Sequence, residues 1–397
     1  MSVKNIIAVY IILLVGPDCF PQIESGFKAR EVLDMIALCN SFTFIDLFHS
    51  DSAILPGGYK KIYTSGTFGM DNKFQLYQKG KLVIINLRGS TDKKVSWLEN
   101  IYSAMIPARG TISISGNRFD YCFAQDTLAS VHGGYALGIA YLYKDILYHI
   151  SNLNRSGFYD FMLTGHSQGG ALANLLRAYL ENLPDSLLSD KNQFKTIVFG
   201  APMIGNKAFA EEYTQRFSNS MTSFNIINPA DPVPKFPVSY KDSGFISDNL
   251  VALFSEKERI DMGKMLNDGF FLLFEDAISN SIKKFSHSAS EQISKELGQV
   301  SLPEYLDDFN YRYLDARVEI PPVEYPKILK DSSILENDSL MAIYPRGEDG
   351  EFLNQELYKK EPWAFQHKPY NYYVSVLKKY FPEQYAVLNK KFLSENL

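Results

Sequence analysis

The sequence has little cysteine: only Cys19, Cys39 and Cys122 occur in 397 residues. They are too few and too widely spaced for a disulfide scaffold or a cysteine-based zinc site. If an N-terminal leader is removed, at most one bridge, between Cys39 and Cys122, can form. The fold must therefore depend on its hydrophobic core. With 46% hydrophobic and 21% charged residues, the chain has enough apolar material for a sizeable core.

Basic charge is also scarce, because 40 Lys and Arg face 45 Asp and Glu and give a formal net charge of −5. No Lys/Arg-rich tract of the kind that follows a nucleic-acid backbone is present, which argues against nucleic acid as a partner. The chain also lacks an HExxH pattern, a Walker-type loop and a Rossmann fingerprint. The sequence therefore implies no metal and no organic cofactor.

The N-terminus carries a short apolar run. Lys4 supplies a positive start, residues 6–15 are apolar, and Gly16 and Pro17 end the run. This is the anatomy of a signal peptide, and the run is much shorter than the roughly 20 apolar residues of a spanning helix. We predict that residues 1–20 are a signal peptide and that the protein is exported, either secreted or periplasmic. An uncleaved membrane anchor is the alternative.

Strand and helix patterns alternate through the middle of the chain. Such alternation predicts an α/β fold with a mostly parallel central sheet flanked by helices. We expect residues 21–397 to form a single domain, in which residues 248–297 are a helical insertion. Helices are predicted over residues 29–42, 135–150 and 171–183 and near the C-terminus; strands are predicted over 74–77, 81–87, 158–164, 195–199 and 224–227, with short strand-like runs at 318–320 and 340–344.

The strongest motif is FMLTGHSQGGALANLLRAYL, in which Gly-His-Ser-Gln-Gly lies between a buried strand and a helix. This context fits a nucleophile elbow, with Ser167 as the nucleophile. The tight turn strains the serine backbone and requires Gly165 and Gly169 where side chains would collide. The helix N-terminus then offers the backbone N–H of Gln168 to a developing negative charge. An ordinary glycine-bounded turn with an incidental serine is the alternative.

Five segments occur in an order that resembles the class 3 lipases: INLRGSTDKKVSWLEN, VHGGY, GHSQGG, IVFGAPMIGN and INPADPVPKFP. The resemblance covers residues 81–237 and implies the α/β-hydrolase fold and ester hydrolysis. It also implies that Ser90 is the second oxyanion-hole donor, beside the backbone of Gln168. Thr91 is a neighbouring alternative, and Ser90 could instead serve only its own strand-end turn.

A serine nucleophile needs a base, and the base needs a group that fixes its tautomer. In α/β-hydrolases the acid follows the serine and precedes the histidine. Asp231 lies just beyond a predicted strand, at the position of the family's acid, although an Asp-Pro loop cap is the alternative. Only His287 and His367 follow Asp231. We predict His367, which enters a C-terminal helix, over His287 in the insertion.

These residues predict a serine ester hydrolase that forms an acyl-enzyme on Ser167, with lipid or other esters as substrates, including substrates at a lipid–water interface. No dedicated protein partner is indicated. Residues 101–107 and the insertion are two candidates for a segment that covers the cleft, and simple packing is the alternative for both. Amide hydrolysis or acyl transfer on the same machinery, and an inactive exported lipid-binding protein, are the alternative functions.

Overall fold

A computed structural model describes residues 23–394 except 238–293 and residues 92, 295, 296, 307, 309, 337 and 363. The predicted signal peptide, most of the predicted insertion and His287 lie outside the described residues. These three expectations therefore stay predictions.

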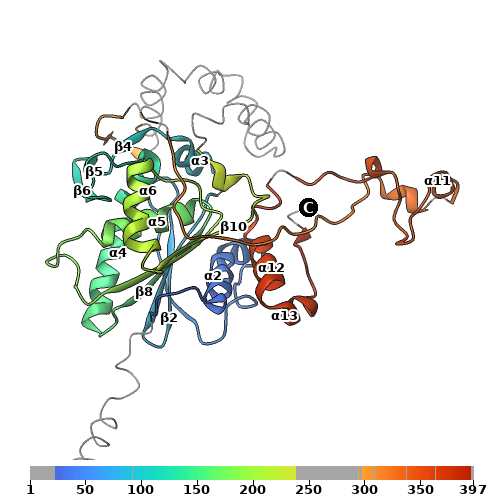
Figure 1. The fold of residues 1–397 in the computed structure, drawn as a ribbon, viewed down its shortest axis with the longest axis horizontal. Coiled ribbons are helices and arrows are strands. Elements are labelled where there is room, and N and C mark those ends of the chain that lie inside the picture. Colours follow the sequence, from blue (N-terminus) through green and yellow to red (C-terminus); the bar gives the residue numbers. More distant parts are fainter. Residues whose placement is uncertain are drawn as a thin grey trace, which may run out of the picture.

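A seven-stranded sheet forms the centre of the molecule, in the order β1-β2-β3-β8-β9-β10-β12 (Figure 1). The pairs from β3 to β12 are all parallel, whereas β1, β2 and β3 pair antiparallel. The mostly parallel sheet predicted from the sequence is confirmed. The strands are β1 Lys60–Thr64, β2 Phe74–Lys79, β3 Leu82–Leu87, β8 Asp160–His166, β9 Gln193–Phe199, β10 Ser223–Ile227 and β12 Arg317–Glu319.

Both faces of the central strands are buried, as expected for parallel strands covered by helices on each side. In β3, Val83 and Ile85 belong to one core cluster, whereas Leu82 and Ile84 belong to a second cluster on the other face. This alternation follows from the two-residue period of a strand. The helices must therefore present apolar faces to both sides of the sheet.

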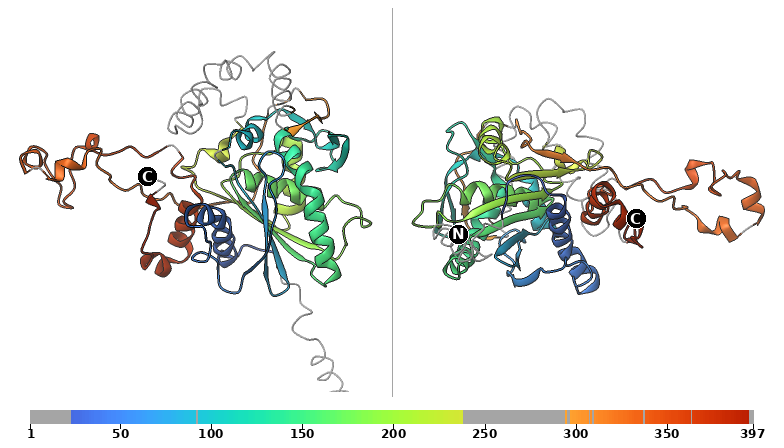
Figure 2. Two further views of the ribbon diagram at one scale, coloured as in Figure 1. Left: turned by 180° about the vertical axis from the view of Figure 1, so that it is seen from behind. Right: turned by 60° about the horizontal axis from the view of Figure 1, so that its bottom comes forward.

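Two pairs of helices meet this need (Figures 1 and 2). α4 and α5 supply the cluster on one face, and α2 and α12 supply the cluster on the other. The helices predicted from the apolar period are confirmed, with somewhat different ends. Their bounds are α2 Ala29–Phe48, α4 Gly133–Arg155, α5 Gln168–Leu180 and α12 Pro369–Tyr380.

Smaller elements surround this core. β11 Val300–Ser301, β5 Arg109–Ile114 and β6 Asn117–Cys122 form a three-stranded sheet, and β4 Met105–Pro107 pairs with β7 Ser130–His132. Among the described residues, the remaining α-helices are α3 Lys94–Ile101, α6 Lys207–Tyr213, α11 Asp338–Ile343 and α13 Pro382–Ala386. Among the described helices, none combines the length and apolar character needed to cross a membrane.

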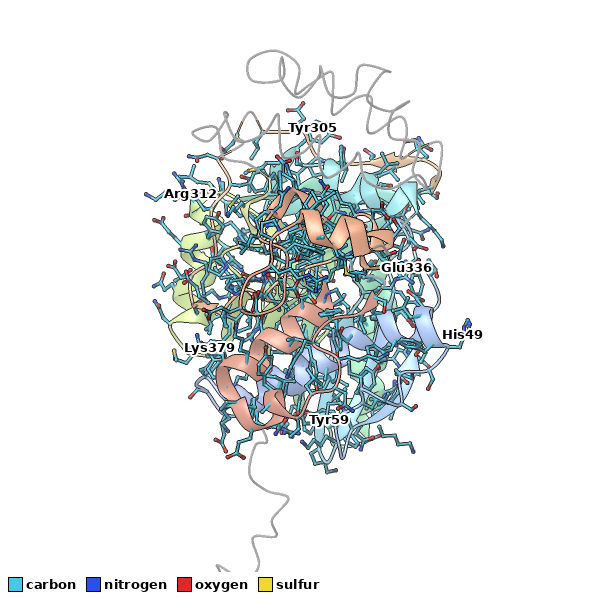
Figure 3. All side chains as sticks on the ribbon, turned by 90° about the vertical axis from the view of Figure 1, so that its right-hand side faces the viewer. His49, Tyr59, Tyr305, Arg312, Glu336 and Lys379 are labelled. Carbon is cyan, nitrogen blue, oxygen red and sulfur yellow. The ribbon has the colours of Figure 1, made fainter. Side chains whose placement is uncertain are left out.

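Residues 324–362 leave the body of the molecule between β12 and α12, and we call them the arm (Figures 1 and 3). The strand expected over residues 340–344 is wrong, because this part of the arm forms α11. A strand needs a neighbouring backbone to pair with, and the described part of the arm offers only isolated bridges such as Leu329–Tyr358. A helix satisfies its own backbone groups, and Leu, Met and Ala favour it.

The bridge considered between Cys39 and Cys122 does not form, because both cysteines are free. Cys39 belongs to the α2 face of the sheet, and its Sγ lies 3.5 Å from Thr164 Oγ1. Cys122 ends β6, whose Phe119 and Tyr121 belong to the cluster on the opposite face. The central sheet separates the two thiols.

Lys195 on β9 is a fully buried cation. Its Nζ donates to the carbonyl oxygens of Glu24 at 2.9 Å and Gly26 at 2.8 Å. It also forms an ion pair with Glu31 at 2.5 Å. The ammonium group thus attaches the segment that precedes α2 to the central sheet.

We expect Lys195→Met to lower the free energy of unfolding by about 2 to 4 kcal/mol, because it leaves two carbonyl oxygens and a carboxylate without the buried ammonium group that they face. Urea unfolding followed by circular dichroism measures the change. Lys207→Met is the matched control, since Lys207 pairs with Glu211 at the exposed surface and should contribute little. Equal stability of the two variants would contradict the anchoring role.

Candidate active site

Ser167 connects β8 directly to α5 and has φ 59° and ψ −131°. A positive φ is strained for a residue with a side chain, and the surroundings must hold it in place. The Ser167 N–H donates to the carbonyl of Phe199 on β9 at 2.9 Å, and its own carbonyl accepts from Gly170 N at 2.9 Å. The turn therefore has the backbone conformation that the elbow motif predicts.

Two glycines allow the helix to approach the strand. A Cβ on Gly165 would lie 2.3 Å from the carbonyl carbon of Gly169, and a Cβ on Gly169 would lie 2.2 Å from Leu87 O. Real Cβ atoms do not approach backbone so closely, so any side chain at either position would push α5 away from the sheet. The close approach keeps Ser167 at the carboxyl edge of the sheet.

His367 joins Ser167 to Asp231. Its Nε2 lies 2.8 Å from Ser167 Oγ, and its Nδ1 lies 2.8 Å from Asp231 Oδ2. A carboxylate beside Nδ1 favours the tautomer that carries its proton there, which leaves Nε2 free to accept the serine proton. Asp231 follows β10 and His367 precedes α12, so the two predicted residues reach the elbow from separate loops.

The Asp231 carboxylate is buried, with the residue only 1% exposed, and its oxygens are supplied with donors. Oδ1 accepts from Val233 N at 2.9 Å, and Oδ2 accepts from the Tyr372 hydroxyl at 2.7 Å as well as facing His367. Burial and the Asp231 charge raise the pKa of Tyr372 well above its usual value of 10, so Tyr372 stays a donor. Sequence reasoning predicted a helix near the C-terminus but did not find this contact.

The ring of the neighbouring His166 packs against the ring of His367. The two rings have centroids 4.6 Å apart, and burial followed by the charge of His367 lowers the pKa of His166 well below 6.5. A second positive charge beside the His367 ring is thereby avoided. This ring contact also limits how far the His367 ring can turn.

Ser90, the predicted oxyanion residue, faces Gln168. The Ser90 hydroxyl donates to Gln168 Oε1 at 2.7 Å and accepts from Asn100 Nδ2 at 2.8 Å. The hydroxyl of Thr91, the alternative, instead donates to Asp71 Oδ2 at 2.7 Å. Gln168 is the first residue of α5, so its backbone N–H is one of the helix-start donors with no intrahelical acceptor. Ser90, and not Thr91, thus places its hydroxyl beside the Gln168 side chain.

Asp71 fixes the loop that carries Ser90. Its carboxylate forms ion pairs with Arg88 at 2.9 Å and Lys93 at 2.7 Å. Burial raises the pKa of Asp71, but the hydrogen bonds from Lys93 and Thr91 and the charge of Arg88 outweigh it, and the net effect lowers the pKa. The Asp71 side chain therefore holds both ends of this loop as a charged group.

Glu99 lies behind Gln168 and is fully buried. Its Oε2 accepts from Asn72 Nδ2 at 2.7 Å, and Asn72 Oδ1 in turn faces Gln168 Nε2 at 3.5 Å. Burial raises the pKa of Glu99 to about 8, against smaller lowering effects of the hydrogen bonds from Asn72 and Gln168. Sequence reasoning missed this residue, because a glutamate on an amphipathic helix is typically exposed.

In the part of the chain that the structure describes, no three His, Cys, Asp or Glu side chains gather in a way that could hold a metal ion. What the site presents is a hydroxyl, an imidazole, a buried carboxylate and a helix start. This set can perform acyl transfer without further groups.

We expect Glu99→Gln to change how stability depends on pH. Between its ordinary pKa of 4.5 and the folded value of about 8, wild-type Glu99 keeps its proton when folded and loses it when unfolded. The folded state then binds more protons, so stability falls as pH rises through this window. Glutamine cannot ionise. The variant should gain stability relative to wild type from about pH 5 to about pH 8.

Melting temperatures measured by calorimetry at several pH values and one ionic strength test this expectation. Glu336→Gln, at an exposed position, is the control and should follow the wild-type curve. A difference between Glu99→Gln and wild type that stays constant with pH would contradict the buried, protonated glutamate.

Part of the chain is similar to known lipases. Residues 84–241 match the family model described as lipase (class 3). Over 139 residues the chain is 27% identical to secreted mono- and diacylglycerol lipase 1 of Fusarium solani. This aligned segment makes up 34% of this chain and 39% of that protein. Over 87 residues it is 34% identical to lipase ZK262.3 of Caenorhabditis elegans, which covers 22% and 23%. The chain thus spans less than half the length of both curated relatives.

A solved structure of a fungal lipase–inhibitor complex is also similar, with a TM-score of 0.41 and 22% sequence identity over 53% of this chain and 74% of that one. The family match encloses Ser167 and Asp231, while His367 lies beyond its end. The resemblance noted in the sequence is confirmed by this match. Residues 84–241, the segment that the family model matches, are thus similar to the class 3 lipases.

Proposed function

We propose that this protein is a serine hydrolase that cleaves carboxylic esters of lipids through an acyl-enzyme on Ser167. The observation that carries the proposal is the continuous hydrogen-bonded chain from Ser167 through His367 to the buried Asp231, built on a nucleophile elbow. Each member has the partner that its role requires.

In the proposed reaction, Ser167 Oγ attacks the ester carbonyl carbon while His367 Nε2 takes the hydroxyl proton. Negative charge develops on the carbonyl oxygen, where the Gln168 N–H and Ser90 stabilise it. The tetrahedral intermediate expels the alcohol, which receives the proton from His367. Water then attacks the carbonyl carbon of the acyl-enzyme while His367 Nε2 takes its proton. The intermediate releases the carboxylic acid, and the proton returns from His367 to Ser167 Oγ. The Asp231 carboxylate stabilises the imidazolium that forms twice in the cycle.

Lipid esters are the substrate class that the family match favours, since the two curated relatives carry the names of lipases. One of them is named as a secreted mono- and diacylglycerol lipase, which supports acylglycerols as substrates and export of this chain by its predicted signal peptide. Water is the proposed acceptor. The proposal includes action at a lipid–water interface.

The structure bears on one of the two segments considered as a cover. Tyr102, Met105 and Ile106 are buried, and β4 pairs with β7. These contacts fit simple packing of residues 101–107 within the core. The second candidate, residues 248–297, lies almost entirely outside the described residues and stays a prediction.

Hydrolysis of p-nitrophenyl esters over a series of acyl lengths tests the proposal, with wild type compared with Ser167→Ala. The substitution removes the nucleophile, so we expect a loss of about 10⁴-fold or more in kcat. Ser156→Ala, at the exposed end of α4, is the matched control and should retain full activity.

Other outcomes separate the alternatives. Full activity of Ser167→Ala would contradict the proposed nucleophile. A wild type that cleaves amides but not esters would replace ester hydrolysis with peptide chemistry on the same residues. A wild type that cleaves neither and is not labelled by a fluorophosphonate would favour the lipid-binding alternative.

A further inference from the structure

Gln366, the residue before His367, has a buried side chain with all its hydrogen-bonding capacity in use. Its Oε1 accepts from Asn228 Nδ2 at 2.8 Å and Val323 N at 3.1 Å. Its Nε2 donates to Val323 O at 2.8 Å and Glu361 Oε1 at 2.7 Å. A glutamine amide has two N–H donors and a carbonyl that accepts two bonds, so the amide is fully satisfied while the residue is only 4% exposed.

One of these partners belongs to the loop that carries Asp231. Asn228 O accepts from Asp231 N at 2.9 Å, and Asn228 Oδ1 accepts from Ala230 N at 3.0 Å. The Asn228 N–H also donates to the Tyr372 hydroxyl at 3.2 Å. Asn228 therefore orders the loop of the acid, and its remaining donor reaches Gln366.

The other two partners lie at the neck of the arm. Val323 is the last residue before the arm leaves the body, and Glu361 lies at its returning end. The outgoing and the returning segment of the neck are thus joined through the side-chain amide of Gln366. Figure 1 shows how far the arm projects before the chain returns to α12.

This position matters because the arm packs mainly on itself. Ile334, Phe352 and Tyr358 form a small cluster of their own, separate from the two clusters that cover the sheet. The chain thus reaches His367 by way of a projecting segment, which cannot by itself fix where the histidine lies. A displacement of about 1 Å at a reacting group can cost about 100-fold in rate.

We propose that Gln366 is a positioning residue for the hydrolase reaction: it joins the loop of His367 to the loop of Asp231 and fastens both to the neck of the arm. This inference rests on the proposed function. Gln366 touches neither substrate nor Ser167, so it acts only through His367. Its loss should reduce the rate of the chemical steps and leave substrate binding unchanged.

Gln366→Met in the full chain tests the proposal, because methionine has a similar length and cannot make these four hydrogen bonds. We expect kcat for p-nitrophenyl butyrate to fall by about 10- to 100-fold with KM within about twofold of wild type. The rate constant for labelling by a fluorophosphonate should fall in parallel, since the same histidine activates Ser167. Both kcat and the labelling rate constant are divided by the fraction of protein that the fluorophosphonate labels at completion, so that misfolded protein is not counted.

Gln355→Met is the matched control, because Gln355 lies exposed in the arm. Asn228→Ala supplies a second test. If Gln366 and Asn228 act through the hydrogen bond between them, kcat of the double variant should lie within about twofold of kcat of the slower single variant. If the effects of the two substitutions on kcat multiply in the double variant, the two amides act independently and the proposed connection is overturned.

A purely structural role for Gln366 predicts a lower melting temperature with kcat per labelled site unchanged, and this result would overturn the proposal. If Gln366→Met does not fold, Glu361→Ala removes one of the four bonds at an exposed position. A reduced kcat with constant KM then supports the positioning role, and an unchanged kcat overturns it. An inactive, unlabelled wild type would instead refute the proposed function itself.

Discussion

The two hydrogen bonds of the His367 ring connect parts of the chain that are far apart in sequence. Ser167 lies 200 residues before the histidine, and Asp231 lies 136 residues before it. Parallel strands bring these parts together, because their carboxyl ends share one edge of the sheet. Much of the surrounding structure holds the His367 imidazole between the Ser167 hydroxyl and the Asp231 carboxylate.

Holding it requires buried polar groups, and each such group needs partners. On the acid side, Tyr372 and Val233 N supply donors to Asp231, and Gln366 connects the two loops. On the opposite side, Asp71 anchors the loop of Ser90 as an ion, whereas burial favours the protonated form of Glu99. Two carboxyl groups near the same loop thus have opposite protonation tendencies, set by whether cations accompany the buried charge.

The sequence predicted those features whose cause is local or follows from order. The elbow around Ser167 needs only a strand, a turn and a helix that are adjacent in the chain. Apolar periods located the central strands and helices. Asp231 was predicted from its place just beyond a strand, and order then left His287 and His367, of which we predicted His367. The structure places both side chains within hydrogen-bonding distance of the predicted partner, which order alone could not do.

Other features depend on long-range burial and could not be read from the chain. Nothing near Tyr372, Gln366 or Glu99 in sequence indicates which buried groups they face. The expected strand at residues 340–344 failed for the same reason, because a strand requires a neighbour and α11 lies in a projecting arm. Likewise, the spacing of Cys39 and Cys122 could not reveal that the sheet lies between them.

The most direct test of the proposed site is a crystal structure of the protein after reaction with an alkyl fluorophosphonate, which mimics the tetrahedral intermediate. The expected result is phosphorus bonded to Ser167 Oγ, a phosphonyl oxygen within about 3 Å of the Gln168 N–H and of Ser90, and His367 Nε2 beside the adduct. An adduct on another residue, or a phosphonyl oxygen directed away from both donors, would contradict the proposed site.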